Sequence, residues 1–145
     1  MAEFELEEVQ TYLSLAEEKL IVARDLLMLK HYRDAVARAY YAMFYAAKAA
    51  LLTVGVTGIR KHTGIVSFFA ERFVKTGRID RRYGVILARA LNDRIAADYE
   101  AEFQADDGLA RQAIADAEAF LTKARELVDE AVRAEEKRED EARPL

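Results

Sequence analysis

The chain has 145 residues, of which 52% are hydrophobic and 33% are charged, and its net charge is −4 at pH 7. This length suits one self-supporting domain, and the acidic balance argues against broad affinity for nucleic acids. With no cysteine and two histidines, the chain has no disulfide, thiol nucleophile or histidine-rich metal centre, and neither a metal nor a cofactor is expected.

Helix is expected nearly throughout, because the chain contains one proline and six glycines. The first helix is expected over residues 4–29. Its apolar residues recur in alternating steps of four and three and form one stripe: Val9, Leu13, Ala16, Leu20, Ala23 and Leu27. The start of the chain is acidic and does not read as a signal peptide, so a cytoplasmic protein is expected.

A second helix is expected to follow the KHY segment, residues 30–32, and to run to about residue 52. Its alanines make a smooth face for close helix packing: Ala35, Ala39, Ala42, Ala46 and Ala49. Residues 39–56 hold a single charge, Lys48, but this charge and the many alanines and tyrosines favour a helix buried in a bundle over a membrane span.

Glycines at 55 and 58 predict a loop over residues 53–61. A third helix is expected over 62–76, and a fourth over 81–98 with Asp80 as its N-cap. The inward residues of the fourth helix are expected to be Leu87, Leu91 and Ile95.

The last helix is expected over residues 107–135, with Asp106 or Asp107 capping its start. Residues 136–145 are charge-dense and poor in apolar residues, so a disordered tail is expected there. Residues 1–135 therefore read as one all-α domain. Short connections favour an up-and-down bundle of four to five helices, and the apolar second helix is expected to lie at its centre or at an interface.

Positive charge is concentrated in residues 60–94, where nine Lys and Arg residues face three acids and give a net charge of +6. A local basic surface on an acidic protein can bind phosphates. The alternative is that these side chains lie on solvated helix faces and pair with acids elsewhere.

The most informative polar segment is LNDRIAADY, residues 91–99. Arg94 and Asp98 are four residues apart, so they share a helix face and can form an ion pair. Tyr99 lies about 140° around the helix from Arg94 and reaches the same pocket only where the helix ends or is distorted. The alternative is an inert ion pair beside a partly buried tyrosine.

Further candidate ligand-binding residues precede this segment. Arg38, Tyr41 and Tyr45 share one side of the second helix, although aromatic packing alone would explain the tyrosines. Lys61 and His62 lie at the start of the third helix. A functional role for His62 requires proximity to Arg94; otherwise it caps its helix or bonds to a neighbouring one.

Three segments together, AVARAYYAMFYAAKAALL, KHTGIVSFFAERFVKTGRI and RIAADY, resemble the HEPN family (higher eukaryotes and prokaryotes nucleotide-binding domain) in its small stand-alone prokaryotic branch. The resemblance covers about residues 5–130. It implies a helical bundle that is usually dimeric. Many family members are metal-independent ribonucleases that act as toxins, and minimal nucleotidyltransferases are their partners.

The catalytic motif of the active branch is an arginine followed, four to six residues later, by a histidine. Arg94 matches the arginine, but Asp98 and Tyr99 stand where the histidine is expected, and no histidine follows His62. In such an enzyme the arginine stabilises the charged phosphorane and the histidine transfers protons. A phenol of pKa about 10 and a carboxyl of pKa about 4 are poor replacements at neutral pH, so His62 is the remaining candidate.

Three functions follow as hypotheses. The first is a HEPN-type protein that binds a nucleotide or RNA phosphate, a nucleotidyltransferase partner, or both, without strong catalysis. The second is a metal-independent endoribonuclease that uses Arg94 with Asp98, Tyr99 or His62. The third is a structural dimerising bundle in which the polar segment only orders the helices.

Overall fold

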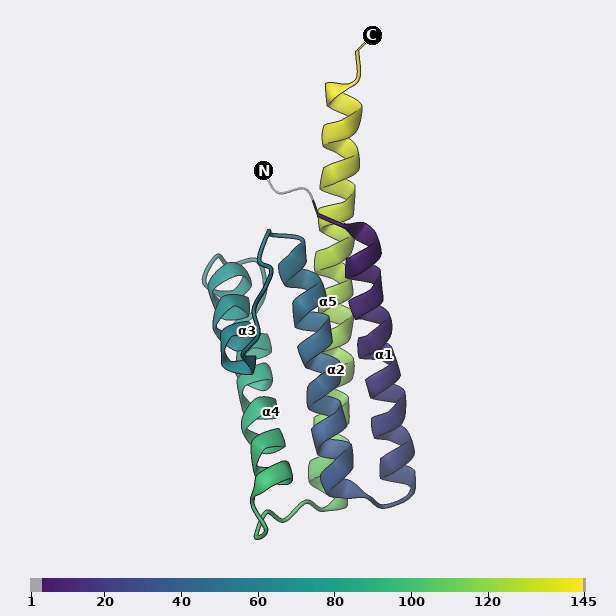
Figure 1. The fold of residues 1–145 in the computed structure, drawn as a ribbon, viewed down its shortest axis with the longest axis vertical. Helices are drawn as coiled ribbons and strands as arrows, with labels where there is room; N and C mark the ends of the chain where they lie inside the picture. The colour runs from purple at the N-terminus through teal and green to yellow at the C-terminus, as the bar shows by residue number, and fades with distance from the viewer. Residues whose placement is uncertain (1–3, 145) are drawn as a thin grey trace.

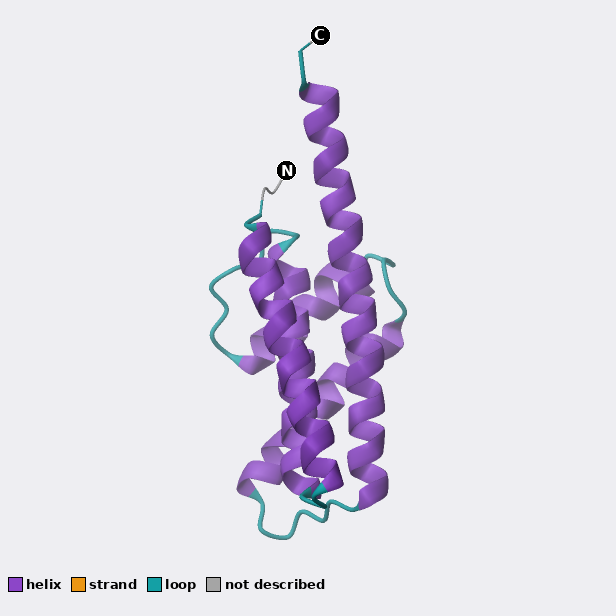
Figure 2. Ribbon diagram, turned by 90° about the vertical axis from the view of Figure 1, so that its right-hand side faces the viewer, coloured by secondary structure: helices purple, strands orange, loops and turns teal. Residues whose placement is uncertain are grey.

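A computed structural model describes residues 4–144, and these residues form helices and connecting loops without a strand (Figure 2). This confirms the all-α bundle. The elements in chain order are α1 (Leu6–Met28), α2 (Tyr32–Leu52), α3 (His62–Phe69), the π-helical turn η1 (Ala70–Val74), α4 (Arg81–Tyr99) and α5 (Asp107–Ala142).

Helix α2 is the centre of the bundle, because it contacts α1, α3, α4 and α5 (Figure 1). Its alanine face is fully buried, as the sequence predicted, at Ala35, Ala39, Ala42, Ala46 and Ala49. Small side chains let neighbouring helix backbones approach closely, so α1 and α5 pack along most of the length of α2.

Aromatic packing holds the short third helix to the rest of the bundle. Phe69 packs against Phe73 of η1 at 5.2 Å between ring centroids and against Phe120 of α5 at 5.0 Å. All three rings are almost completely buried. Gly77, at φ +78°, then ends this segment in a left-handed conformation that suits glycine.

Side-chain caps set the beginnings of the last two helices. The Asp80 carboxylate accepts a hydrogen bond from the Arg82 backbone N–H, and Asp106 accepts one from the Leu109 N–H. Both aspartates therefore satisfy helix-terminal donors that would otherwise lack a partner. They confirm the two predicted starts.

Helix α5 differs from the expectation at its end. It remains helical to Ala142 and extends beyond the other helices (Figure 1), whereas a disordered tail was expected from residue 136. Ion pairs one turn apart support these last turns, between Lys137 and Glu141 and between Arg138 and Glu135.

No helix among residues 4–144 combines the length and apolar character needed to cross a membrane.

Candidate functional site

Arg94 occupies an inward position of α4. Leu87 and Leu91 are buried, and the next steps of three and four residues along the same face reach Arg94 and Asp98. The Arg94 side chain is only 15% exposed. Ile95, which was expected to point inward, is 39% exposed. That prediction was wrong because the inward face continues through the arginine.

Two groups orient the Arg94 guanidinium. Its Nη2 donates a hydrogen bond of 2.7 Å to the Tyr41 hydroxyl on α2, and its Nε lies 3.0 Å from Asp98 Oδ2. The second contact is an ion pair without hydrogen-bond alignment, so the buried Nε has no hydrogen-bond acceptor among residues 4–144. Burial opposes the charge, but Tyr41 and Asp98 outweigh it and raise the pKa of Arg94.

His62, the first residue of α3, is fixed by aromatic side chains of α2. Its Nδ1 lies 2.6 Å from the Tyr40 hydroxyl, and its ring stacks on Phe44 at 4.3 Å between centroids. Burial raises the pKa of the Tyr40 phenol, which therefore stays protonated. Since Tyr40 is 1% exposed and its O–H needs an acceptor, we assign it as the donor to Nδ1. This assignment leaves the imidazole proton on Nε2.

The two candidate groups, Arg94 and His62, meet at Tyr41. Arg94 bonds to the Tyr41 hydroxyl, and the His62 ring lies edge-on to the Tyr41 ring at 6.0 Å between centroids. Burial, followed by the positive charges of Arg94 and Lys48, lowers the pKa of His62. The imidazole is consequently neutral at neutral pH. We call Arg94, Asp98, Tyr41 and His62 the Arg94 site.

Two more predicted residues lie at the edge of this site. The Tyr99 ring centroid is 6.0 Å from Arg94 Cζ, and Tyr99 is 74% exposed as the last residue of α4. Arg38 is also exposed, with its Cζ 5.8 Å from the Tyr41 ring centroid. Arg38 forms no ion pair with Asp93 or Asp98.

The structure does not bring the other two predicted residues into the Arg94 site. Tyr45 instead stacks on Tyr12 of α1 at 6.1 Å between ring centroids. Lys61 is exposed at the position before α3.

Sequence reasoning missed three residues that build the site. Tyr40 and Phe44 hold His62, and their spacing of four along α2 was the available signal. Arg33 was missed as well, although a cation in the first turn of a helix is unfavourable for the helix dipole and so marks an unusual position.

Arg33 stabilises the end of α4, the helix that contains Arg94 and Asp98. Its Nη1 donates to the carbonyl oxygens of Ala97 and Glu100 at 3.1 Å, and its Nη2 donates to those of Ala101 and Phe103 at 3.2 and 2.7 Å. The C-terminal carbonyls of a helix lack partners within the helix. One guanidinium thus satisfies the end of α4 and the start of the following loop.

The basic segment over residues 60–94 is partly neutralised. Three of its nine cations are within ion-pair distance of carboxylates: Arg78 pairs with Glu130, Arg89 with Asp116 and Arg94 with Asp98. The other six have no such partner among residues 4–144, so the segment keeps positive charge available to an anion.

Comparison with known proteins gives a match to the sequence model described as "HEPN domain" over residues 9–127. A protein of Methanocaldococcus jannaschii named "Putative toxin MJ0605" is 40% identical over 86% of this chain and 91% of its own length. A second protein of that organism, "Putative toxin MJ0142", is 34% identical over 80% of this chain and 78% of its own. A "UPF0332 protein" of Thermotoga maritima is 34% identical over 82% and 89%.

Proposed function

Because the chain belongs to the HEPN domain family, we propose that it binds a phosphate group of RNA or of a nucleotide at the Arg94 site, as a component of a toxin–antitoxin-like system. The observation that carries the proposal is the Arg94 guanidinium. It is oriented by Tyr41 and Asp98 and lies beside a histidine whose pKa is lowered. A fixed guanidinium matches the geometry of phosphate oxygens.

The direct test measures binding of fluorescently labelled single-stranded RNA to Arg94→Ala. We expect about a tenfold or greater loss of affinity, since a charge-assisted hydrogen bond contributes about 1.5–3 kcal/mol. Arg81→Ala is the matched control, because Arg81 is an exposed cation on the same helix. Arg94→Lys keeps the positive charge and is the second variant, used in case Arg94→Ala loses affinity only because it does not fold. Equal affinities for Arg94→Ala and Arg81→Ala would refute the proposal.

The second candidate function is metal-independent cleavage of RNA. It is favoured by His62 and Arg94, which both contact Tyr41, because the arginine can stabilise the phosphorane while the Nε2–H of the neutral His62 donates a hydrogen bond to a phosphate oxygen. The test is RNA cleavage in the presence of a chelator by the wild-type protein, Arg94→Ala and His62→Ala. Cleavage that survives both substitutions would reject this mechanism.

The proposal includes two protein partners, a second copy of the chain and a minimal nucleotidyltransferase. Exposed apolar side chains on α4 support the homodimer; they are Val85, Ile95 and Tyr99. The exposed Tyr99 phenol is the candidate acceptor for nucleotide transfer: its oxygen bonds to the α-phosphorus of a nucleoside triphosphate, pyrophosphate leaves, and the phenolic proton passes to solvent. A mass increase of one nucleotide unit or more with the transferase, absent in Tyr99→Phe, is the expected result. The homodimer is tested separately by light scattering, which measures the mass of the assembly.

A further inference from the structure

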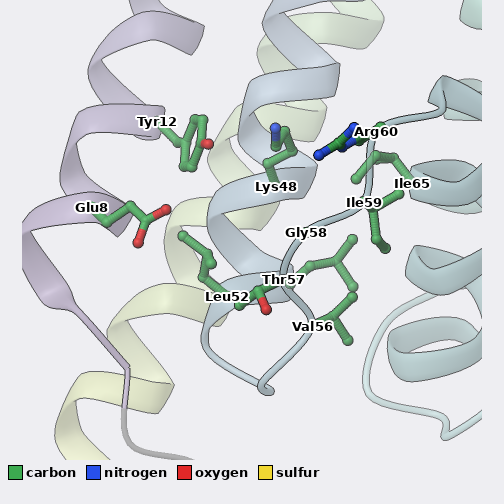
Figure 3. A pocket seen from close by; sticks show the side chains of 11 residues that line it. Glu8, Tyr12, Lys48, Leu52, Val56, Thr57, Gly58, Ile59, Arg60 and Ile65 are labelled. Atoms are coloured by element: carbon green, nitrogen blue, oxygen red, sulfur yellow. The ribbon is translucent and has the colours of Figure 1, made fainter.

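A second cationic site lies near Phe44, whose ring also stacks on His62 of the Arg94 site. A cavity of about 350 Å³ opens between α1, the end of α2 and the loop over residues 53–61 (Figure 3). Its lining includes two basic side chains, Lys48 from α2 and Arg60 from the loop. This volume is in the range of small-ligand pockets.

Neither cation in this cavity is neutralised. No carboxylate oxygen among residues 4–144 lies within the 4.0 Å ion-pair distance of Lys48 or Arg60. The Lys48 ammonium instead lies 4.9 Å from the Tyr12 ring centroid and 5.4 Å from that of Phe44. Two like charges that share one cavity and form no ion pair make binding of an anion favourable.

The acid in the cavity lies on the opposite wall. Glu8 projects from α1, whereas Lys48 and Arg60 extend from the other side (Figure 3). A phosphate is therefore favoured on the Lys48 and Arg60 side. The Glu8 carboxylate is placed to accept hydrogen bonds from sugar hydroxyls.

The cavity is electrostatically connected to the Arg94 site. Phe44 is the shared element, because it stacks on His62 and also faces the Lys48 ammonium. The charges of Lys48 and Arg94 both act to lower the pKa of His62. A cation from each site therefore acts on the same imidazole.

We infer that this cavity binds a second phosphate of single-stranded RNA, next to the phosphate held at the Arg94 site, with Lys48 and Arg60 as its ligands. The inference rests on the proposed phosphate binding at Arg94. Tyr12 adds an aromatic wall of the kind on which an unpaired base stacks.

The test compares two probes, AMP and a labelled single-stranded oligoadenylate of about eight nucleotides, on Lys48→Gln, Arg60→Gln and Lys75→Gln. Lys75 is an exposed cation of the same basic segment and serves as the control. Each cavity variant is expected to weaken oligoadenylate binding about tenfold. Each should also make the plot of log affinity against log salt concentration less steep, by about 0.7 in the slope. AMP competition should stay unchanged, because a single phosphate binds at Arg94.

Four outcomes distinguish the possibilities. Cavity variants that bind oligoadenylate like Lys75→Gln, while Arg94→Ala loses binding, overturn the second site and keep the first. Loss in the cavity variants with unaltered Arg94→Ala keeps the cavity and refutes the Arg94 proposal. A wild-type protein that binds neither oligoadenylate nor AMP refutes both proposals. Cavity variants that lose affinity for AMP as well as for oligoadenylate overturn the assignment of a second phosphate.

Arg60→Gln is the decisive variant if Lys48→Gln does not fold, because Arg60 is an exposed residue of the loop.

Discussion

His62 shows how the fold changes the chemistry of a single side chain. Burial and the charges of Arg94 and Lys48 all disfavour its protonated form. The Tyr40 hydroxyl at Nδ1 and the stacked Phe44 ring fix its position. The result is a neutral imidazole beside a guanidinium, which are the two groups that phosphate chemistry uses.

The lowered pKa of His62 predicts a dependence of stability on pH. The unfolded chain takes up the His62 proton near pH 6.5, whereas the folded chain does so only at lower pH. His62 therefore leaves the free energy of unfolding unchanged above about pH 6.5 and reduces it as the pH falls through the folded pKa. Urea unfolding at about pH 7.5, 6.5 and 5.5 measures this loss.

His62→Gln should flatten that dependence between about pH 7 and 5.5. His31→Gln is the control, because His31 is an exposed histidine at the start of α2 and should keep the wild-type slope. Equal slopes for the wild-type protein and His62→Gln would contradict the assigned direction.

The sequence predicted part of the Arg94 site at this scale. A spacing of four was enough to pair Arg94 with Asp98. It was not enough to bring His62 to Tyr40 and Phe44, because that contact depends on the path of the loop over residues 53–61 and on how α3 packs against α2. Periodicity carries no information about either.

At the scale of helices, Arg33 stabilises the C-terminal end of α4. Four carbonyl oxygens between residues 97 and 103 accept its hydrogen bonds. Asp98 and Tyr99 lie within this fastened segment. Arg33 is thus a positioning residue for the Arg94 site, although it does not contact Arg94.

Arg33→Lys should loosen this segment. An ammonium keeps the charge but cannot reproduce the planar fork that reaches four carbonyls. We expect faster hydrogen exchange in residues 97–103 and a loss of about 1–2 kcal/mol in the free energy of unfolding. Unchanged exchange there, compared with wild-type protein at equal pH, would show that the helix end holds without the guanidinium.

The starts of the last two helices and the buried helix faces were the most predictable parts of the fold. Asp80 and Asp106 cap the helices that they were expected to cap, and the stripes of α1 and the alanines of α2 are buried as predicted. Ile95 was misplaced because the pattern of apolar residues cannot indicate that a charged side chain takes the next inward position. The π-helical turn η1 also had no signal in the sequence.

At the scale of the whole molecule, α5 has two parts with different surroundings. Its buried residues run from Ala110 to Val128 and line the core beside α2. The turns after residue 135 are exposed and are supported by ion pairs within the helix. Exposed pairs of this kind contribute little to stability.

Deleting residues 136–145 should therefore change the free energy of unfolding by less than about 0.5 kcal/mol. Deleting residues 127–145 should instead cost several kcal/mol, about 2–5 for each large buried side chain lost, because it also removes the buried Leu127 and Val128. Urea unfolding of both truncations measures the difference. A large loss from the shorter deletion would show that the last turns pack against another part of the protein.

The start of α1 and the end of α5 lie at one end of the bundle, and the end of α4 lies at the other (Figure 1). The last turns of α5 are thus a suitable point of attachment for immobilising the protein. Attaching the protein to a sensor surface through them would leave the end of α4, with Asp98 and Tyr99, directed toward the solution. A phosphate ligand would then reach the end of α4 at the Arg94 site without steric obstruction by the support.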